Sequence, residues 1–582
     1  MRAQLDNLLR KALADITAGS ENLAPSDLDP QIERTRDPKH GDFASNVALR
    51  LTKTLSRPPR DLAAAIIAAL PASPLLQAAD VAGPGFINLR LRPVAYHEEL
   101  AAILAAGDRY GCSQLGKGQS LIVEYVSANP TGPLHVGHGR HAAYGASLAN
   151  VLRATGHDVH EEYYVNDAGR QMEILAASVW IRYAQRLGHK LPFPGNCYQG
   201  AYVSEIAADL ARQHDRAFDG DLTELLRIIA ATDIEAEKQL DLTIAAIKTL
   251  TGEQAFRTVF DAALDSVLED IKDDLEEFGV VPQSWYSERS LVDSGAIARA
   301  LDLLESSGML YTKDGAKWFR ASDFGDEKDR VVVRENGVST YFASDIAYHF
   351  QKCERGFTHL LDVLGADHHG YVARVQAGLE AMGAPRDSLE VRLVQFVTLY
   401  RGQQKMQMST RSGEYVTLRQ LREEVGNDAA RFFYVSRSND QHLEFDLELA
   451  KSQSNDNPVY YIQYAHARIA SMLERLQAEK LEFAGPAASN LALLVEPEEH
   501  SLMVALSRYP EQLQLAAVNR APQQIAHFLR DIAAAFHTCY NAHRVLVGET
   551  ELRNARVMLA LATQQTIRNG LSLLGVSAPT AM

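Results

Sequence analysis

Residues 120–144 read SLIVEYVSANPTGPLHVGHGRHAAY, and this segment is the strongest indication of how the chain folds. The apolar run from Leu121 to Val126 is typical of a buried strand, and the Pro and Gly residues after it predict a turn. The turn delivers HVGH, residues 135–138, to the start of a helical pattern. A helix N-terminus offers unpaired backbone N–H groups, glycines allow close approach, and imidazoles donate hydrogen bonds, so the segment predicts a phosphate-binding site.

A bare His-x-Gly-His is a weak indication by itself, and its surroundings have to decide. Strand, turn and helix in this order are the surroundings that the motif needs. Glu124 in the strand and Asn129 in the turn add polar groups aimed at the same crevice. The alternative is a surface loop that contains two histidines.

The size and composition of the chain indicate a multidomain protein of the cytoplasm. Its 582 residues exceed one domain, and 46% hydrophobic with 23% charged residues is ordinary for soluble globular protein. No apolar run reaches eighteen residues, and Met1 to Leu9 begins an amphipathic helix rather than a signal peptide. None of the four cysteines forms a C-x-x-C pair, so we expect neither disulfides nor a structural metal; they are Cys112, Cys197, Cys353 and Cys539.

The formal net charge of -16 argues against bulk, nonspecific attraction to nucleic acid. It does not exclude a local basic face, because much of the excess lies in acidic stretches such as Leu268 to Phe278. Basic residues gather near the C-terminus, among them Arg544, Arg553 and Arg556. The charge therefore leaves an RNA partner open.

Changes of pattern along the chain divide it into six regions. The order of strand and helix signals predicts an α/β fold, a doubly wound parallel sheet interrupted by a helical insertion, with an α+β domain before it and an all-α domain after it. The expected regions are an N-terminal domain (1–110), a first sheet half (111–185), the insertion (186–328), a second sheet half (329–400), a polar loop region (401–455) and a helical C-terminal domain (456–582).

Several strands are expected in the second half of the sheet. Val331–Arg334 and Ser339–Phe342 flank Asn336-Gly337, which is a strong hairpin signal. His359–Gly365 and Val391–Val397 are short, mostly apolar runs typical of buried strands.

A second candidate for phosphate contact is the polar loop Lys405–Gly413, which precedes the helical pattern Leu418–Val425. Cations and hydroxyls on such a loop suit a departing pyrophosphate, on which charge builds in the transition state. The loop could instead be a solvated connector.

These residues resemble a known family. Ala128–His138 resembles the HIGH region of class I aminoacyl-tRNA synthetases, and Met408–Ser412 resembles a degenerate KMSKS loop. The surroundings are similar to bacterial arginyl-tRNA synthetases along the whole chain, in the stretches His40–Asn46, Gly83–Ile87, Tyr341–Tyr348, Gly365–Gly370 and Leu574–Val576.

The resemblance implies an ATP site and a catalytic set. ATP would be bound by Pro130, Gly132, His135, Gly137, His138, Gly139, Gly365, Asp367, Met408, Ser409 and Arg411. The catalytic set would be His135, His138, Lys405 and Arg411. This loop lacks the usual KMSKS lysine, and either Arg411 or Lys405 supplies the charge; the two side chains are not interchangeable.

The amino-acid pocket can be argued from the residues as well. A guanidinium is planar and permanently charged, so carboxylates suit it; Glu124 and Asp345 would provide two, and Tyr341 could cover the guanidinium plane. Each carboxylate has an alternative role, Glu124 in a salt bridge and Asp345 as a helix cap. The resemblance implies an arginine-binding set of Glu124, Ser127, Asn129, His135, Tyr341, Asp345 and His369. We reject a metal at His368 and His369, because adjacent histidines point in different directions.

The resemblance also implies contacts with tRNA. Tyr460, Tyr464 and Arg468 share a helix face, suited to stacking on RNA bases or to core packing. The full set of candidates is Phe43, Asn46, Tyr460, Tyr464, Arg468, His537, Tyr540 and Arg544.

The expected function is arginine–tRNA ligation: ATP with Mg²⁺ activates L-arginine to arginyl-adenylate, and the arginyl group passes to the terminal adenosine of tRNA(Arg). The resemblance further implies a monomer that activates arginine only with tRNA bound. Two alternatives are a different HxGH nucleotidyltransferase and a synthetase relative that keeps only tRNA binding.

Overall fold

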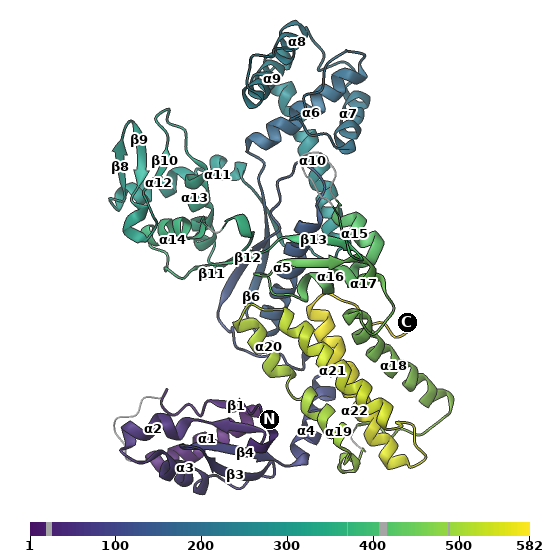
Figure 1. Ribbon diagram of the computed structural model, residues 1–582. Helices are drawn as coiled ribbons and strands as arrows, with labels where there is room; N and C mark the ends of the chain where they lie inside the picture. The colour runs from purple at the N-terminus through teal and green to yellow at the C-terminus, as the bar shows by residue number, and fades with distance from the viewer. Residues whose placement is uncertain (19–25, 369, 407–415, 487–488) are drawn as a thin grey trace.

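Five parallel strands form the central sheet, in the order β12-β11-β5-β6-β7 (Figure 1). The strands are β5 (Ser120–Tyr125), β6 (Asp158–Val165), β7 (Ser284–Ser287), β11 (His359–Gly365) and β12 (Leu389–Val394). The chain leaves β5 toward β6 on one side and returns as β11 on the other. The point at which the strand order reverses therefore lies between β5 and β11, where ligands bind in such sheets.

The computed structural model describes residues 1–18, 26–368, 370–406, 416–486 and 489–582. Within β5, residues 121–125 are all buried, as expected for a parallel strand covered on both faces. The helices nearest the site are α5 (Val136–Ala154), α13 (Tyr341–Glu354) and α14 (Val372–Ala381). The doubly wound sheet predicted from the sequence is confirmed.

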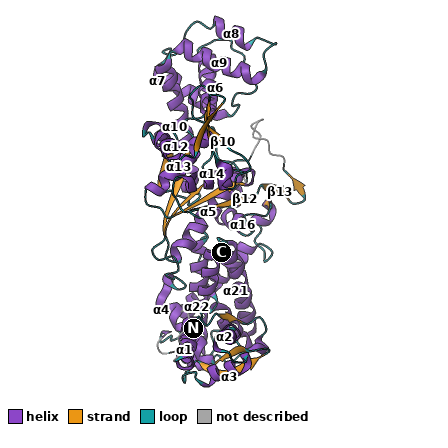
Figure 2. Cartoon of the chain, turned by 90° about the vertical axis from the view of Figure 1, so that its left-hand side faces the viewer, coloured by secondary structure: helices purple, strands orange, loops and turns teal. Residues whose placement is uncertain are grey.

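A helical insertion separates β6 from β7, as predicted. It consists of α6 (Arg170–Arg186), α7 (Ala201–His214), α8 (Thr223–Ile229), α9 (Ala236–Thr251) and α10 (Glu253–Glu277). Figures 1 and 2 both place this insertion and the N-terminal domain at opposite ends of the molecule, with the sheet between them.

The predicted hairpin around Asn336-Gly337 is wrong in its second strand. Residues 330–333 form β10, but β10 pairs with β9 (Ala316–Phe319), which pairs in turn with β8 (Leu310–Lys313). After a single bridge between Val333 and Ser339, Tyr341 begins α13. The hydroxyl of Thr340 caps that helix, so local capping outweighs the strand signal. Two short helices, α11 (Arg289–Asp293) and α12 (Ala296–Ser306), precede this small sheet.

The predicted strand Val391–Val397 is two strands. β12 ends at Val394, and β13 (Val397–Arg401) joins a different sheet with β14 (Gln404–Lys405) and β15 (Leu443–Asp446). The segment that follows includes α15 (Leu418–Val425), α16 (Asn427–Val435) and α17 (Leu447–Lys451). The helix predicted at Leu418–Val425 is thus confirmed.

The N-terminal domain packs helices on a four-stranded antiparallel sheet. Its elements are α1 (Arg2–Thr17), β1 (Ile32–Arg34), β2 (Phe43–Ser45), α2 (Val47–Leu55), α3 (Pro59–Ala68), β3 (Leu76–Ala82) and β4 (Phe86–Leu91), followed by α4 (Pro93–Ala106). Arg34 reaches the C-terminal domain, where its Nε lies 2.6 Å from Glu511 Oε2.

The C-terminal domain is helical, with α18 (Pro458–Ala478), α19 (Pro497–Leu506), α20 (Tyr509–Val518), α21 (Gln523–Ala542) and α22 (Thr550–Leu573). Buried Arg431 on α16 fastens the end of the C-terminal domain to the rest of the molecule. Its guanidinium donates hydrogen bonds to the carbonyls of Leu574 (3.0 Å) and Phe278 (2.8 Å). Among the described residues, no helix combines the length and apolar character needed to span a bilayer.

Gly575 sits against this arginine with φ of +65°, and a methyl group added there would overlap the fixed guanidinium. We expect Gly575→Ala to destabilise the fold by about 2 to 4 kcal/mol, from the left-handed backbone and the overlap together. The control is Gly548→Ala, whose methyl group would meet nothing within 4 Å. The thermal unfolding midpoint should fall in Gly575→Ala and remain unchanged in Gly548→Ala. Equal midpoints in the two variants would contradict this role of Gly575.

Candidate functional site

The turn after β5 has an unusual backbone. Val126 and Ser127 have φ of +68° and +38°, a region that β-branched residues in particular avoid. Beyond them the turn is tied down: the Thr131 amide donates to the Asn129 carbonyl (2.7 Å), and the Tyr202 hydroxyl donates to the Thr131 carbonyl (2.5 Å). Strained backbone held by surrounding contacts is typical of functional sites, and this one lies at the strand-order reversal.

His135 and His138 form a stacked pair at the start of α5, with ring centroids 3.6 Å apart. His135 is the N-cap residue, and its Nδ1 accepts from the amides of Gly137 (3.0 Å) and His138 (3.3 Å). Nδ1 of His138 accepts in turn from the His135 amide (3.3 Å). Because Nδ1 is the acceptor in both rings, Nε2 carries the proton in both neutral rings.

The charge of this pair follows from its surroundings. Burial lowers the pKa of His135, and burial followed by the neighbouring His135 lowers the pKa of His138 well below its ordinary value. Both rings are therefore neutral near pH 7. Each ring can therefore act as a hydrogen-bond donor through Nε2–H, beside the N-terminus of α5.

The glycines between residues 132 and 139 are required for different physical reasons. A Cβ at Gly132 would meet the Tyr202 hydroxyl, and one at Gly137 would meet the His135 ring. A Cβ at Gly139 would instead strike buried Leu418 and Tyr434. Packing of α5 thus explains why residue 139 is a glycine.

The remaining ATP candidates lie at both edges of the crevice. Pro130 is buried in the turn after β5. Gly365 ends β11, where a Cβ would meet the Asp367 carboxylate, and Asp367 itself is exposed. Both strand ends expected from the sequence therefore meet at the reversal point.

A row of three carboxylates crosses the central sheet. Asp362 on β11 is the register partner of Glu124 on β5, and Glu124 is the partner of Glu162 on β6. All three side chains are buried. Like charges aligned across neighbouring strands repel, and buried charges require partners.

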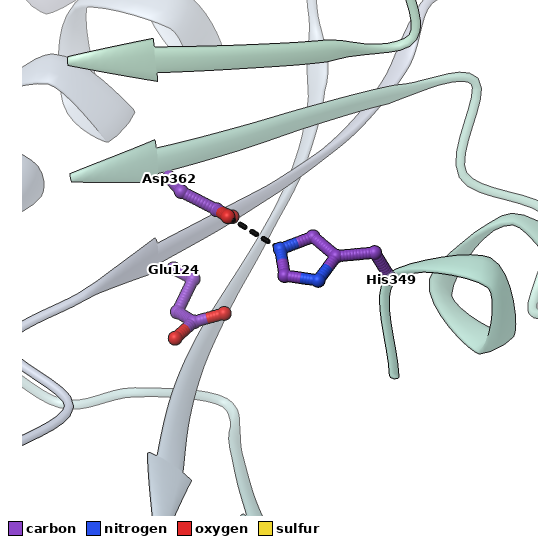
Figure 3. Close-up of side chains that lie close together, drawn as sticks. All are labelled: Glu124, His349 and Asp362. Atoms are coloured by element: carbon purple, nitrogen blue, oxygen red, sulfur yellow. Dashed lines mark hydrogen bonds and ion pairs between the residues drawn. The ribbon is translucent and has the colours of Figure 1, made fainter. Parts of the chain in front are cut away.

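One helix face supplies those partners. Lys352 Nζ on α13 lies 2.6 Å from Glu124 Oε2 and 3.0 Å from Asp362 Oδ1, and His349 Nε2 lies 2.7 Å from Asp362 Oδ2 (Figure 3). The Tyr348 hydroxyl contacts Glu124 (2.8 Å) and Glu162 (2.9 Å). Arg355, directly after the helix, pairs with Glu162 at 2.7 Å. We call Asp362, Glu124 and Glu162 the carboxylate row.

These ion pairs fix the charge of each group. Burial alone would lower the pKa of Lys352, but the charges of Asp362 and Glu124 raise it. Asp362 likewise raises the pKa of His349, and Lys352 and His349 together hold the pKa of Asp362 far below its ordinary value against the effect of burial. Glu124, His349 and Asp362 have the types and spacing of metal ligands (Figure 3). An ammonium group already neutralises them, so the cluster is an internal ion-pair network rather than a metal site.

The arginine candidates surround the same crevice. Asp345 is half-buried on the first turns of α13, and since Thr340 is the N-cap, the alternative role of Asp345 as a cap is excluded. Burial raises the pKa of Asp345 to about 6, although a hydrogen bond from Tyr371 acts to lower it. Tyr341 is 61% exposed at the helix start.

Two further candidates lie in the turn after β5. Ser127 donates to Glu124 Oε1 at 3.0 Å. Asn129 is exposed, and its Oδ1 accepts from Asn166 at 3.1 Å. The salt-bridge alternative for Glu124 is correct, which does not exclude a role in binding.

The sequence analysis missed Glu288, directly after β7. It is buried, its Oε2 has no hydrogen-bond partner, and burial followed by the charges of Asp345 and Asp167 raises its pKa to about 7. Asp167, at the end of β6, is paired with Arg289 (3.0 Å). The signal was available, since both carboxylates follow parallel strands, but β7 was not recognised.

Lys405 lies on β14, exposed, in register with Tyr400. The other candidates of the predicted phosphate loop, Met408, Ser409 and Arg411, lie outside the described residues, as does His369.

The RNA candidates divide into buried and accessible residues. Phe43 is fully buried under the Arg34 guanidinium, so the predicted tRNA contact is wrong: its ring belongs to the core of the N-terminal domain. Asn46, at the start of α2, is half-buried with an unpaired Oδ1.

The predicted helix face of Tyr460, Tyr464 and Arg468 meets the candidates of α21 in one column. Tyr460 stacks on Tyr464 (6.1 Å), and Arg468 lies over Tyr464 and, at 4.3 Å, over Tyr540. His537 stacks beneath Tyr464 but is 7% exposed, so it supports the column rather than contacting RNA. Arg544 lies beyond the end of α21, exposed.

Comparison with protein families accounts for nearly the whole chain. Residues 3–91 match the arginyl tRNA synthetase N terminal domain, residues 99–468 match the catalytic domain of class I tRNA synthetases (R), and residues 462–582 match the DALR anticodon binding domain.

Individual relatives agree. The arginine–tRNA ligase of Thioalkalivibrio sulfidiphilus is 54% identical, and that of Coxiella burnetii 50%; the matches cover 100% of this chain and 100% and 99% of the relatives. A crystal structure described as a putative arginyl-tRNA synthetase from Campylobacter jejuni is 31% identical, with a TM-score of 0.72 over 84% of this chain and 99% of that one. The Thermus thermophilus arginyl-tRNA synthetase, 24% identical, shares the fold over the full length of both chains, with a TM-score of 0.75.

These matches favour the synthetase interpretation over the two alternatives. The chain therefore belongs to the arginyl-tRNA synthetase family, within class I of the aminoacyl-tRNA synthetases, and is an arginine–tRNA ligase.

Proposed function

We propose that Asp345 and Glu288 hold the guanidinium of L-arginine, and that His135 and His138 stabilise the phosphate that the arginine carboxylate attacks. The observation that carries this division of roles is the distribution of charge around the crevice. Glu124 is paired with Lys352, and Asp167 with Arg289. Neither Asp345 nor Glu288 forms an ion pair with any residue that the structure describes. Two carboxylates without a cationic partner among the described residues suit one bidentate cation.

Glu124 then has a smaller part in recognition than the sequence predicts. Its Oε2 accepts from Lys352 and Tyr348, and its Oε1 accepts from Ser127. A carboxylate has about four acceptor positions, so Glu124 keeps one for the substrate. Tyr341 covers the guanidinium, and Asn129, with Ser127 beside it, holds the amino-acid end of the substrate.

Activation needs positioning and charge stabilisation rather than a covalent intermediate. The arginine carboxylate attacks the α-phosphate of ATP in line, and pyrophosphate leaves with Mg²⁺. The Nε2–H groups of His135 and His138 donate to the phosphate oxygens as charge develops on them. Gly365 and Asp367 receive the adenosine across the crevice. Lys405 and Arg411 hold the pyrophosphate.

In the second step the arginyl group passes to the terminal ribose of tRNA(Arg). The column formed by Tyr460, Tyr464, Arg468 and Tyr540 offers aromatic faces and a cation for stacking on RNA bases. Tyr460 also lines a cavity of about 400 Å³ between α18 and the α16–α17 segment. We further propose a monomer that acts in the cytoplasm and activates arginine only with tRNA bound.

His138→Asn isolates the donor role of this histidine. Asn offers an acceptor in place of Nδ1 but no donor at the place of Nε2, so adenylate formation should fall about 100- to 1,000-fold. His138→Gln, which can place a donor near Nε2, should recover part of the loss. The rates come from pyrophosphate exchange with tRNA present. An undiminished rate in His138→Asn would exclude this role.

Asp345→Asn and Glu288→Gln test the guanidinium site. Each variant removes a charged hydrogen bond, so the KM for arginine should rise about 10- to 100-fold, with little change in the KM for ATP. The matched control is Asp293→Asn, since Asp293 is exposed at the end of α11 and its carboxylate forms no hydrogen bond or ion pair with the residues that the structure describes. Unchanged KM values in both site variants would mean that the guanidinium lies elsewhere.

The raised pKa values predict a pH dependence. The guanidinium stays charged, but a carboxyl group with a pKa of about 7 is about nine-tenths protonated at pH 6. The kcat/KM for arginine should therefore rise about tenfold between pH 6 and pH 8, since this ratio follows ionisation of the free enzyme. Glu288→Gln should flatten that rise and leave a weaker one near pH 6, from Asp345. An unaltered profile in Glu288→Gln would assign the rise to another group.

A further inference from the structure

Lys352 is a fully buried ammonium group whose hydrogen bonds go to protein carboxylates. It bridges Glu124 and Asp362, which face each other in register on neighbouring strands. Burying an ammonium costs several kcal/mol unless its partners repay it. An apolar side chain in the same space would leave both buried carboxylates without a cation, so the role of Lys352 goes beyond packing.

The first consequence of Lys352 concerns the turn that binds the amino acid. Lys352 and Tyr348 occupy Oε2 of Glu124, which leaves Oε1 directed at the Ser127 hydroxyl, 3.0 Å away. Ser127 Oγ also accepts from the Tyr164 amide at 3.0 Å. Ser127 has positive φ and stands two residues before Asn129. The orientation of Glu124 thus reaches the strained turn directly.

The second consequence concerns α13. His349 binds Asp362 through Nε2, and its Nδ1 lies 2.7 Å from the backbone carbonyl of Asp345. Lys352 and His349 therefore hold this helix on β5 and β11 from the same face that carries Asp345. Figure 3 shows the side chains of Asp362 and His349 meeting between the strands and the helix, with Glu124 beside them.

We propose that Lys352 is a positioning residue for arginine: it is the internal counter-ion that orients Glu124 and seats α13, so that Ser127 and Asp345 meet the substrate. This proposal rests on the function proposed above, because it assumes that Asp345 binds arginine. Lys352 itself does not touch the substrate.

A purely structural role makes a different prediction. If Lys352 only stabilised the fold, its loss would lower the amount of active enzyme and thus the apparent kcat, and the surviving molecules would bind arginine normally. If it positions the pocket, the KM for arginine rises in the folded enzyme.

The test is Lys352→Met in the full-length enzyme, with KM for arginine and for ATP measured by pyrophosphate exchange in the presence of tRNA. We expect the KM for arginine to rise about 10- to 100-fold, the loss typical of a small misplacement of binding groups, with the KM for ATP changed less than about twofold. The matched control is Arg355→Met, which removes a cation from the other end of the carboxylate row. Among the described residues, Arg355 forms an ion pair with Glu162 alone, so its loss should lower stability and leave the KM for arginine unchanged.

Lys352→Met leaves two buried carboxylates without their cation, which can prevent folding. Lys352→Met with Asp362→Asn removes one of the two orphaned charges and should recover stability without recovering the KM for arginine. A normal KM for arginine in either folded variant, or an equal rise in Arg355→Met, overturns the proposal. If Lys352→Met raises the KM for arginine while Asp345→Asn and Glu288→Gln each leave it unchanged, the proposed guanidinium site is wrong instead.

Discussion

The ion pairing between the carboxylate row and α13 is the constraint on which the site depends. Asp362, Glu124 and Glu162 lie side by side on β11, β5 and β6, inside a sheet that is covered on both faces. Such a row is unfavourable until cations approach it, and the necessary cations come from a single helix face and the residue after it. Because α13 must dock there, the second half of the fold is held in place over the first.

The position of the pocket follows from that docking. The same helix that neutralises the row begins with Tyr341 and carries Asp345, so its first turns lie at the carboxyl ends of the strands. On the other side of the reversal point, β5 runs into the strained turn and then into the capped start of α5. The proposed amino-acid and phosphate positions thus belong to two structures that are fixed separately, one by a buried ion-pair network and the other by a helix cap.

Local features of the site could be predicted from the sequence, and distant ones could not. The strand, turn and helix around residues 120–144 depend on neighbouring residues only, and the same holds for β11 and the helix at Leu418. Phe43 was assigned to RNA because a single sequence does not reveal which side of a short strand is covered. Lys352 owes its role to Glu124, which lies 228 positions away in the chain, and Glu288 owes its role to Asp345 and Asp167, which belong to other elements, so no local pattern reveals either role.

The charge of the proposed pocket shows why contacts between distant residues matter for specificity. The sequence predicts two carboxylates, Glu124 and Asp345, for one guanidinium. In the structure four carboxylates approach the crevice, and two of them have internal partners, Lys352 for Glu124 and Arg289 for Asp167. Asp345 and Glu288 remain, and the charge of Asp345 helps to raise the pKa of Glu288. In the proposed site a bound guanidinium would relieve that repulsion, whereas an uncharged side chain would leave it in place, so the internal cations would contribute to the proposed preference for arginine.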